Sequence, residues 1–177
     1  MAIPVSLADA KVQLRLETDD VSRDVEVSGY IADAAGWVEK YTGHILVARD
    51  VTEQFRGFEA VNLRAWPVKP AAVVGVAYLD ASGAPIEITG AVVDTTSRPA
   101  RVRLGGGIFW PFRDALQLFT VTVRAGYEPA DEVPRNFRRA MLVMISAYDS
   151  DREGGELLQT AEASARRLCR DYRLRRL

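Results

Sequence analysis

The chain has 177 residues, of which 48% are hydrophobic and 27% are charged, and its net charge is −1. This is the composition of a globular protein of about one domain, so it excludes intrinsic disorder as a description of the whole chain. The longest apolar run, Ala71–Leu79, is far shorter than the ~18 residues that a membrane-spanning helix needs, and the N-terminus carries no visible signal peptide. We therefore expect synthesis in the cytoplasm and no membrane partner.

Apolar residues at helical spacing predict three helices that pack together as a small bundle. The first covers residues 6–16 and begins at Ser6, whose side chain can cap the free backbone N–H groups. The second covers residues 22–42 and ends at Gly43, a common helix stop. The third covers residues 134–149 and has a proline in its first turn, where proline is well tolerated.

The middle of the chain, residues 45–126, is rich in β-branched and aromatic residues. It predicts an antiparallel sheet inserted between the helices, with a hairpin turn at residues 80–83. Pro67 and Pro70 flank a short link that we do not expect to lie in a central strand. The expected strands are Val47–Phe55, Val61–Arg64, Val73–Leu79, Arg98–Leu104 and Leu118–Arg124.

The C-terminal residues 156–177 predict an amphipathic helix and a basic tail that follow a core of residues 1–155. The fold class is thus α+β, a small helical bundle with an inserted antiparallel β-rich region and a C-terminal amphipathic helix. Two placements of that helix stay open. Either Gly154-Gly155 attaches it flexibly and it docks on a partner, so that a chain truncated after residue 155 stays folded, or it packs on its own domain. Its apolar stripe comprises Leu157, Ala161, Ala165, Leu168 and Tyr172.

The sequence offers few groups for catalysis or metal binding. His44 is the only histidine and Cys169 the only cysteine, which excludes a zinc site built from these residue types. A catalytic triad would have to use His44, which we expect at a surface corner just after Gly43. The acidic clusters near residues 19 and 151 are interpreted as a solvated turn and a polar helix end. We expect no enzyme activity, no metal and no cofactor.

A glycine-rich segment carries three large aromatic residues. Gly105-Gly106-Gly107 lacks the spacing and the lysine of phosphate-binding loops, so we interpret it as a hairpin loop. Aromatic residues exposed on a loop are typical of protein interfaces. The predicted interface loop therefore includes Phe109, Trp110 and Phe112.

Four stretches together resemble the head–tail connector (adaptor) proteins of long-tailed phages and of related gene transfer agents. None of them is specific alone, and the combination is characteristic. The stretches are Val5–Leu16 followed by Asp19-Asp20, Tyr30–Ala35 leading to Val38–Gly43, Leu63–Val68 with Val76–Asp80, and Val123–Tyr127 with Val133-Pro134.

The resemblance implies a structural, non-enzymatic protein of the virion, located at the head–tail junction. Such adaptors form a ring, usually of twelve copies, below the portal protein after DNA packaging. The ring offers a surface to the stopper or tail-completion protein, and DNA passes through its channel without sequence-specific binding. The fold implied is a small helical bundle, with a β-rich insertion in this subgroup.

The C-terminal helix and tail are predicted to bind the portal, because the C-termini of such adaptors often reach it and arginine forms strong hydrogen bonds to carboxylates. Two alternatives remain: a nucleic-acid-binding regulator that uses the arginine-rich C-terminus, and a small enzyme without a metal. Tight, salt-dependent binding of duplex DNA would favour the regulator. The predicted portal-binding residues are Arg166, Arg167, Leu168, Arg170, Tyr172, Arg173, Arg175, Arg176 and Leu177.

Overall fold

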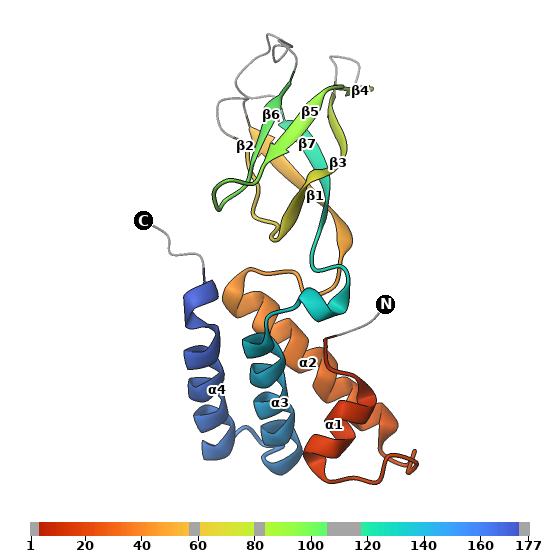
Figure 1. Cartoon of the computed structure of the whole chain (residues 1–177), viewed down its shortest axis with the longest axis vertical. Coiled ribbons are helices and arrows are strands. Elements are labelled where there is room, and N and C mark those ends of the chain that lie inside the picture. The colour runs from red at the N-terminus through yellow and green to blue at the C-terminus, as the bar shows by residue number, and fades with distance from the viewer. Residues whose placement is uncertain (1–3, 57–60, 80–83, 106–117, 174–177) are drawn as a thin grey trace. The chain divides into compact units, whose positions relative to one another are not determined.

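The computed structural model describes residues 4–56, 61–79, 84–105 and 118–173, and it divides into two compact units (Figure 1). The helical unit comprises Met1–Val47 and Tyr127–Leu177. The sheet unit comprises Ala48–Gly126, so it is an insertion between two parts of the helical unit. This arrangement confirms the predicted α+β class with a β-rich insertion.

The helical unit is a bundle in which α3 contacts both α2 and α4, while α1 lies against α2 and α3. The predicted helices are confirmed, although the first is shorter than expected and the proline at position 134 is the N-cap of its helix rather than a residue of the first turn. The elements are α1 (Leu7–Leu14), α2 (Asp24–Thr42), η1 (Ala130–Glu132), α3 (Arg135–Ser150), α4 (Glu156–Cys169) and η2 (Arg170–Tyr172).

Local sequence fixes where the first two helices begin and end. Ser6 and Asp9 form a capping box, in which the Ser6 hydroxyl accepts a bond from the Asp9 backbone N–H at 3.1 Å and the Asp9 carboxylate accepts one from the Ser6 N–H. The residues that cap the ends of α1 and α2 are Arg15 and Gly43, both in the left-handed conformation, which glycine adopts without steric cost. The predicted cap and stop are therefore confirmed.

The capping box predicts a pH-dependent loss of stability in Ser6→Ala. The Ser6 hydroxyl and backbone hold the pKa of the Asp9 carboxyl below its usual range, so this contribution is present at neutral pH and is lost as the pH falls through that lowered pKa. We expect the variant to lose about 1 kcal/mol at pH 7. Urea unfolding at several pH values should show the difference from wild type shrinking in acid, whereas a constant difference would contradict the assignment.

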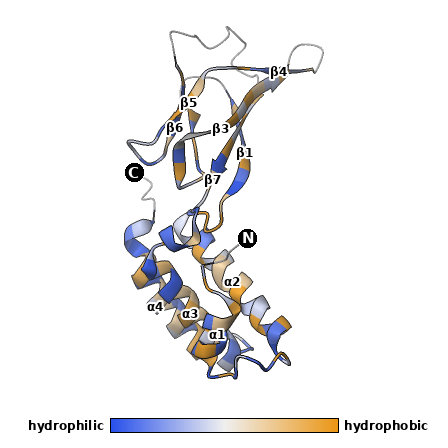
Figure 2. Ribbon diagram, turned by 45° about the vertical axis from the view of Figure 1, so that its right-hand side comes forward, coloured by the Kyte–Doolittle hydropathy of each residue, from blue (hydrophilic) through white to orange (hydrophobic). Residues whose placement is uncertain are grey.

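The core of the helical unit is formed by apolar stripes from all four helices (Figure 2). α2 buries residues at the helical spacing of the predicted stripe, among them Val27, Ile31 and Val38. α3 contributes the largest buried side chains, and each contributes about 1.5–3 kcal/mol by leaving water. The buried residues of α3 are Phe137, Ala140, Met141, Met144, Ile145 and Ala147.

Two antiparallel sheets make up the described part of the sheet unit, where the sequence had predicted one. The larger sheet has the strand order β1-β7-β3-β4 and the smaller has the order β2-β6-β5. On β7 the residues Phe119, Val121 and Val123 alternate inward and are fully buried. The strands are β1 (Arg49–Arg56), β2 (Val61–Asn62), β3 (Val68–Leu79), β4 (Pro85–Glu87), β5 (Ala91–Asp94), β6 (Arg101–Leu104) and β7 (Leu118–Ala125).

The strand expected at Val73–Leu79 is longer in the structure, because β3 begins at Val68 and includes the link around Pro70. β4 pairs only with Ala77–Leu79, so among the described residues this link has no strand on its second side, as the prolines predicted. The register of β3 with β7 shifts between Val68 and Val73, so the ladder is irregular where the proline lacks an N–H donor. The predicted hairpin turn at residues 80–83 lies outside the described residues, but β3 and β4 pair antiparallel on either side of it.

Candidate docking surface

The C-terminal helix α4 packs along α3 within the helical unit. Its residues Ala161, Ala165 and Cys169 are buried in the core. Leu158 and Leu168 are partly buried against the same core. Of the two placements that the sequence left open, the structure therefore has the helix on its own unit, so most of its apolar stripe is covered by the protein itself.

The turn before α4 is hydrogen-bonded rather than a free linker. The Asp151 carboxylate accepts bonds from the N–H groups of Gly155 at 2.9 Å and Leu158 at 3.2 Å, which lowers the pKa of Asp151. A Cβ on Gly155 would lie 3.1 Å from both Asp151 oxygens, so glycine permits this close approach. Because a carboxylate at the N-terminus of a helix is favourable, this turn fixes where α4 begins.

A cluster of aromatic rings holds the other end of α4. Tyr172 packs against Phe137 with ring centroids 4.7 Å apart, and His44 contacts both rings edge-on. His44 is only 4% exposed, and its Nδ1 lies 2.7 Å from the Tyr127 hydroxyl. The expectation of a surface corner was therefore wrong, because the chain after Gly43 turns inward and gives the imidazole a hydrogen-bonding partner in the core.

The described residues of the last turns of α4 and of the segment after it include four exposed arginines. Arg166 pairs with Glu162 at 2.9 Å along the helix, and Arg170 lies 3.7 Å from Asp171. The Arg173 guanidinium sits over the Tyr41 ring, 5.3 Å from its centroid. Arg167 is exposed as well. The arrangement is a basic end on a rigid helix, suited to binding carboxylates or phosphates.

The other predicted binding residues fall into two groups. Leu168 and Tyr172 are partly buried in the core of the unit, so the structure assigns them a packing role. Arg175, Arg176 and Leu177 lie outside the described residues, as does the predicted interface loop of Phe109, Trp110 and Phe112.

The described residues offer no assembled catalytic or metal centre. Within them, no group of three or more histidine, cysteine, aspartate or glutamate side chains could hold a metal ion. Cys169 is buried, and burial raises the pKa of its thiol to about 11, which leaves it unreactive near neutral pH. No helix among the described residues has the length and hydropathy needed to cross a membrane.

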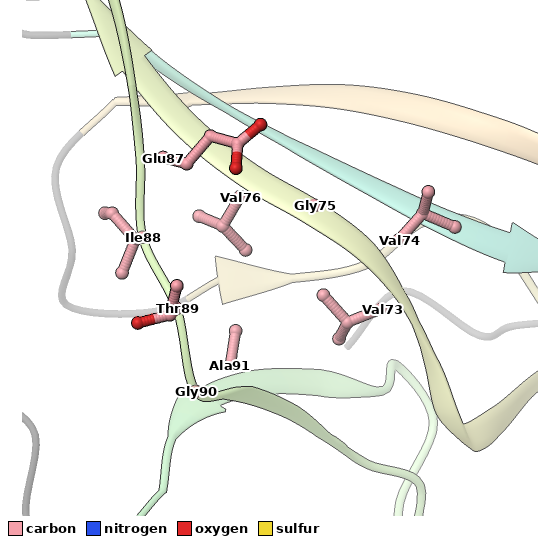
Figure 3. A pocket seen from close by; sticks show the side chains of 9 residues that line it. All are labelled: Val73, Val74, Gly75, Val76, Glu87, Ile88, Thr89, Gly90 and Ala91. Atoms are coloured by element: carbon pink, nitrogen blue, oxygen red, sulfur yellow. The ribbon is translucent and has the colours of Figure 1, made fainter.

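A pocket of about 260 Å³ lies in the sheet unit, beside β3 (Figure 3). Its lining comes from Val73–Val76 on one side and Glu87–Ala91 on the other. Glu87 and Thr89 are the polar side chains of this lining, which contains no histidine, lysine, serine or cysteine. The lining therefore has a single ionisable group and no acid–base pair.

A buried lysine organises the connection between α1 and α2, and the sequence analysis missed it. Lys11 is 3% exposed, and its ammonium group lies 2.5 Å from an Asp24 carboxylate oxygen. It also donates to the backbone carbonyls of Thr18 at 3.1 Å and Asp20 at 2.8 Å. The signal was present, since Lys11 lies four residues after Leu7 and therefore on the inward side of α1.

The fold is similar to that of chains in the neck of gene transfer agent (GTA) particles. For a chain in the neck of an empty GTA particle, computed with C6 symmetry, the TM-score is 0.79 at 18% sequence identity. The TM-score is 0.76 for a chain in the virion of a native GTA particle and 0.74 for one in its neck computed with C12 symmetry, both at 18% identity. Each match covers 100% of this chain and 94% of the other. No family model and no curated protein matches the sequence.

Proposed function

We propose that this chain, which has the fold of a gene transfer agent neck protein, is a structural connector in the neck of a phage-like particle. The observation that carries the proposal is the extent of the structural similarity, because it covers the whole chain, including both the helical and the sheet unit. A connector needs stable surfaces rather than reactive groups, and the packed helical unit with its fixed basic end supplies such a surface.

The finer form of the proposal is an adaptor ring, with twelve copies, beneath the portal of a DNA-filled head. The ring would carry the stopper or tail-completion protein and leave a channel for DNA. The symmetries of the similar neck structures support a cyclic assembly. The portal contact is proposed at the basic end of α4, because its exposed arginines project from a helix that is itself anchored in the core.

The role is tested by deleting the gene for this chain in the cell that produces the particles. We expect DNA-filled heads without attached tails, and plasmid-borne wild-type protein should restore complete particles. Electron cryomicroscopy of purified particles shows whether the deletion removes the tails and whether the plasmid-borne protein restores them. Particles with normal necks in the deletion strain would refute the role. Tight, salt-dependent binding of duplex DNA by the purified chain, together with normal particles, would favour the regulator instead.

The portal contact predicts that Arg170→Gln with Arg173→Gln separates folding from attachment. Both side chains are exposed, so the melting temperature should stay within a few degrees of wild type. Heads isolated from cells that produce the variant should carry at least tenfold less of the chain, measured by quantitative mass spectrometry against the portal protein. Arg135→Gln with Arg139→Gln, also exposed on the helical unit, is the matched control. Equal attachment of both variants would exclude this contact.

A further inference from the structure

The outer face of α2 is uncovered by any other part of the chain that the structure describes. It comprises exposed residues on the side opposite the buried stripe: Val25, Ser28, Gly29, Ala32, Asp33, Gly36 and Lys40. Val25 is 90% exposed, the largest value among the exposed large hydrophobic residues. The charged residues of this face, Asp33 and Lys40, lie two or more turns after Val25. Depletion of charge around an exposed apolar residue is typical of the centre of a protein interface.

Within the described residues of the helical unit, no contact requires the two glycines of this face. A Cβ added at Gly29 or Gly36 would meet nothing within 4 Å. Glycine in a helix interior is unfavourable relative to alanine, so both positions lower helix stability without a packing gain in this chain. A second surface that approaches the helix closely would use the space that they leave.

The outer face of α4 has complementary features. Leu157 is 60% exposed at the start of this helix. Thr160 and Ala163 follow on the exposed side, and then come Arg166 and Arg167. This face therefore presents a large apolar side chain, small residues and positive charge in that order along the helix.

The two faces lie on different helices of the bundle, and these helices run in the same direction. α3 contacts both α2 and α4, and α2 and α4 also contact each other. Arg23, just before α2, pairs with Asp149 at the end of α3, so these two helices are antiparallel. The short turn after α3 makes α4 antiparallel to α3 too, and α4 is therefore parallel to α2.

The positions of the apolar and charged groups match along these parallel helices. At 1.5 Å per residue, Asp33 lies ~12 Å beyond Val25 on α2, and Arg166 lies ~13.5 Å beyond Leu157 on α4. Lys40 on α2 lies ~22 Å beyond Val25, and Asp171 in η2 lies ~22 Å beyond Leu157. Both side chains are exposed. Two helices aligned at Val25 and Leu157 would therefore bring unlike charges together twice.

We propose that the outer face of α2 on one copy packs against the outer face of α4 on the next copy in the ring. The partner is a second copy of this chain, and the inference rests on the proposed neck function. Every subunit of a cyclic ring presents two different surfaces to its two neighbours. The exposed faces of α2 and α4 supply such a pair, with Leu157 packed against the small residues of α2. Arg166 and Arg167 then contact the neighbouring copy, whereas Arg170 and Arg173 are left for the contact with the portal.

The contact is tested by disulfide trapping in assembled particles. Particles containing Val25→Cys with Leu157→Cys should give, after mild oxidation, a ladder of covalent multimers on a non-reducing gel. Val25→Cys with Asn136→Cys is the control, because Asn136 is exposed on α3 and outside both faces. If the chain is present in particles but the two pairs cross-link equally poorly, the interface is wrong. If the chain is absent from wild-type particles, the proposed function itself fails.

A charge exchange tests the same contact without cysteines. Asp33→Arg alone, or Arg166→Glu alone, should reduce the amount of chain in particles at least tenfold. Co-production of the two variants should restore it, because alternating copies then have an exchanged pair at one interface and the wild-type pair at the next. Unchanged incorporation of the single variants would refute the inference, as would failure of the mixture when both variants fold. Circular dichroism and melting of each purified variant check folding.

Discussion

Removal of residues 156–177 is expected to unfold the helical unit rather than to release a dispensable docking segment. The truncation deletes α4, whose Ala161, Ala165 and Cys169 are fully or nearly fully buried. It also removes Tyr172 from its contact with Phe137. The apolar side of α3 that α4 covers would then face water.

The free energy of unfolding lost on truncation is comparable to the whole stability of a domain of this kind. Large side chains contribute about 1.5–3 kcal/mol each when they leave water, so the loss of the α4 contacts costs on the order of 5 kcal/mol or more. Domains of ordinary stability have about 5–15 kcal/mol in total. We therefore expect the truncated chain to be aggregated or to bind a dye for exposed apolar surface, with far-ultraviolet circular dichroism below that of wild type.

A control variant separates the packing of α4 from the charge of its exposed face. Changing Arg166, Arg167 and Arg170 to glutamine keeps every buried side chain of α4 and should leave unfolding by urea cooperative. A truncated chain that is soluble, monomeric and melts cooperatively would contradict the core role of α4. It would then favour the docking helix that the sequence also allowed.

Helix periodicity and local capping were sufficient to predict most of the bundle. Ser6 with Asp9, the spacing Val27–Ile31–Val38 and the stop at Gly43 are all signals within one turn or one stripe, and the structure confirms them. Such signals involve neighbours in sequence, so one chain contains all the information needed to interpret them.

The features that sequence analysis missed depend on contacts between distant residues. His44 is buried because Tyr127 and Phe137, more than 80 residues away, close around it. The path of β3 through Pro70 depends on the irregular ladder with β7. The α4 stripe was recognised, but whether it faces α3 or a partner is a tertiary choice that its periodicity does not determine.

The outer face of α2 shows a second reason why the sequence alone did not predict every feature. The apolar residues of this helix predict its core stripe, but their spacing does not identify which of the residues between them form a second surface. Gly29 and Gly36 carry information only after the structure shows that their missing side chains leave open space. A helical glycine without a packing reason in its own chain is then a signal for a surface that another molecule approaches.

The second large effect is expected at Lys11. Its ammonium group is enclosed with the Asp24 carboxylate and two backbone carbonyls, and it ties the segment between α1 and α2 to the helical unit. Lys11→Ala leaves the carboxylate and both carbonyls without this cation. We expect a loss of about 2–3 kcal/mol from the charged hydrogen bonds and the packing of the buried stem. This is less than the cost of breaking a fully buried ion pair, because the Asp24 side chain is 29% exposed and water can reach it.

Lys11→Met distinguishes the charge from the packing of the aliphatic stem. We expect Lys11→Met to be destabilised less than Lys11→Ala, since methionine fills much of the same volume while losing the polar contacts. Lys40→Ala is the matched control, because Lys40 is exposed near the end of α2, and it should change stability by no more than about 0.5 kcal/mol. Urea unfolding at pH 7 measures all three, and hydrogen exchange should accelerate first in residues 15–24. A Lys11→Ala variant within 1 kcal/mol of wild type, on the scale of an ordinary surface change, would show that the buried lysine is not what holds this connection.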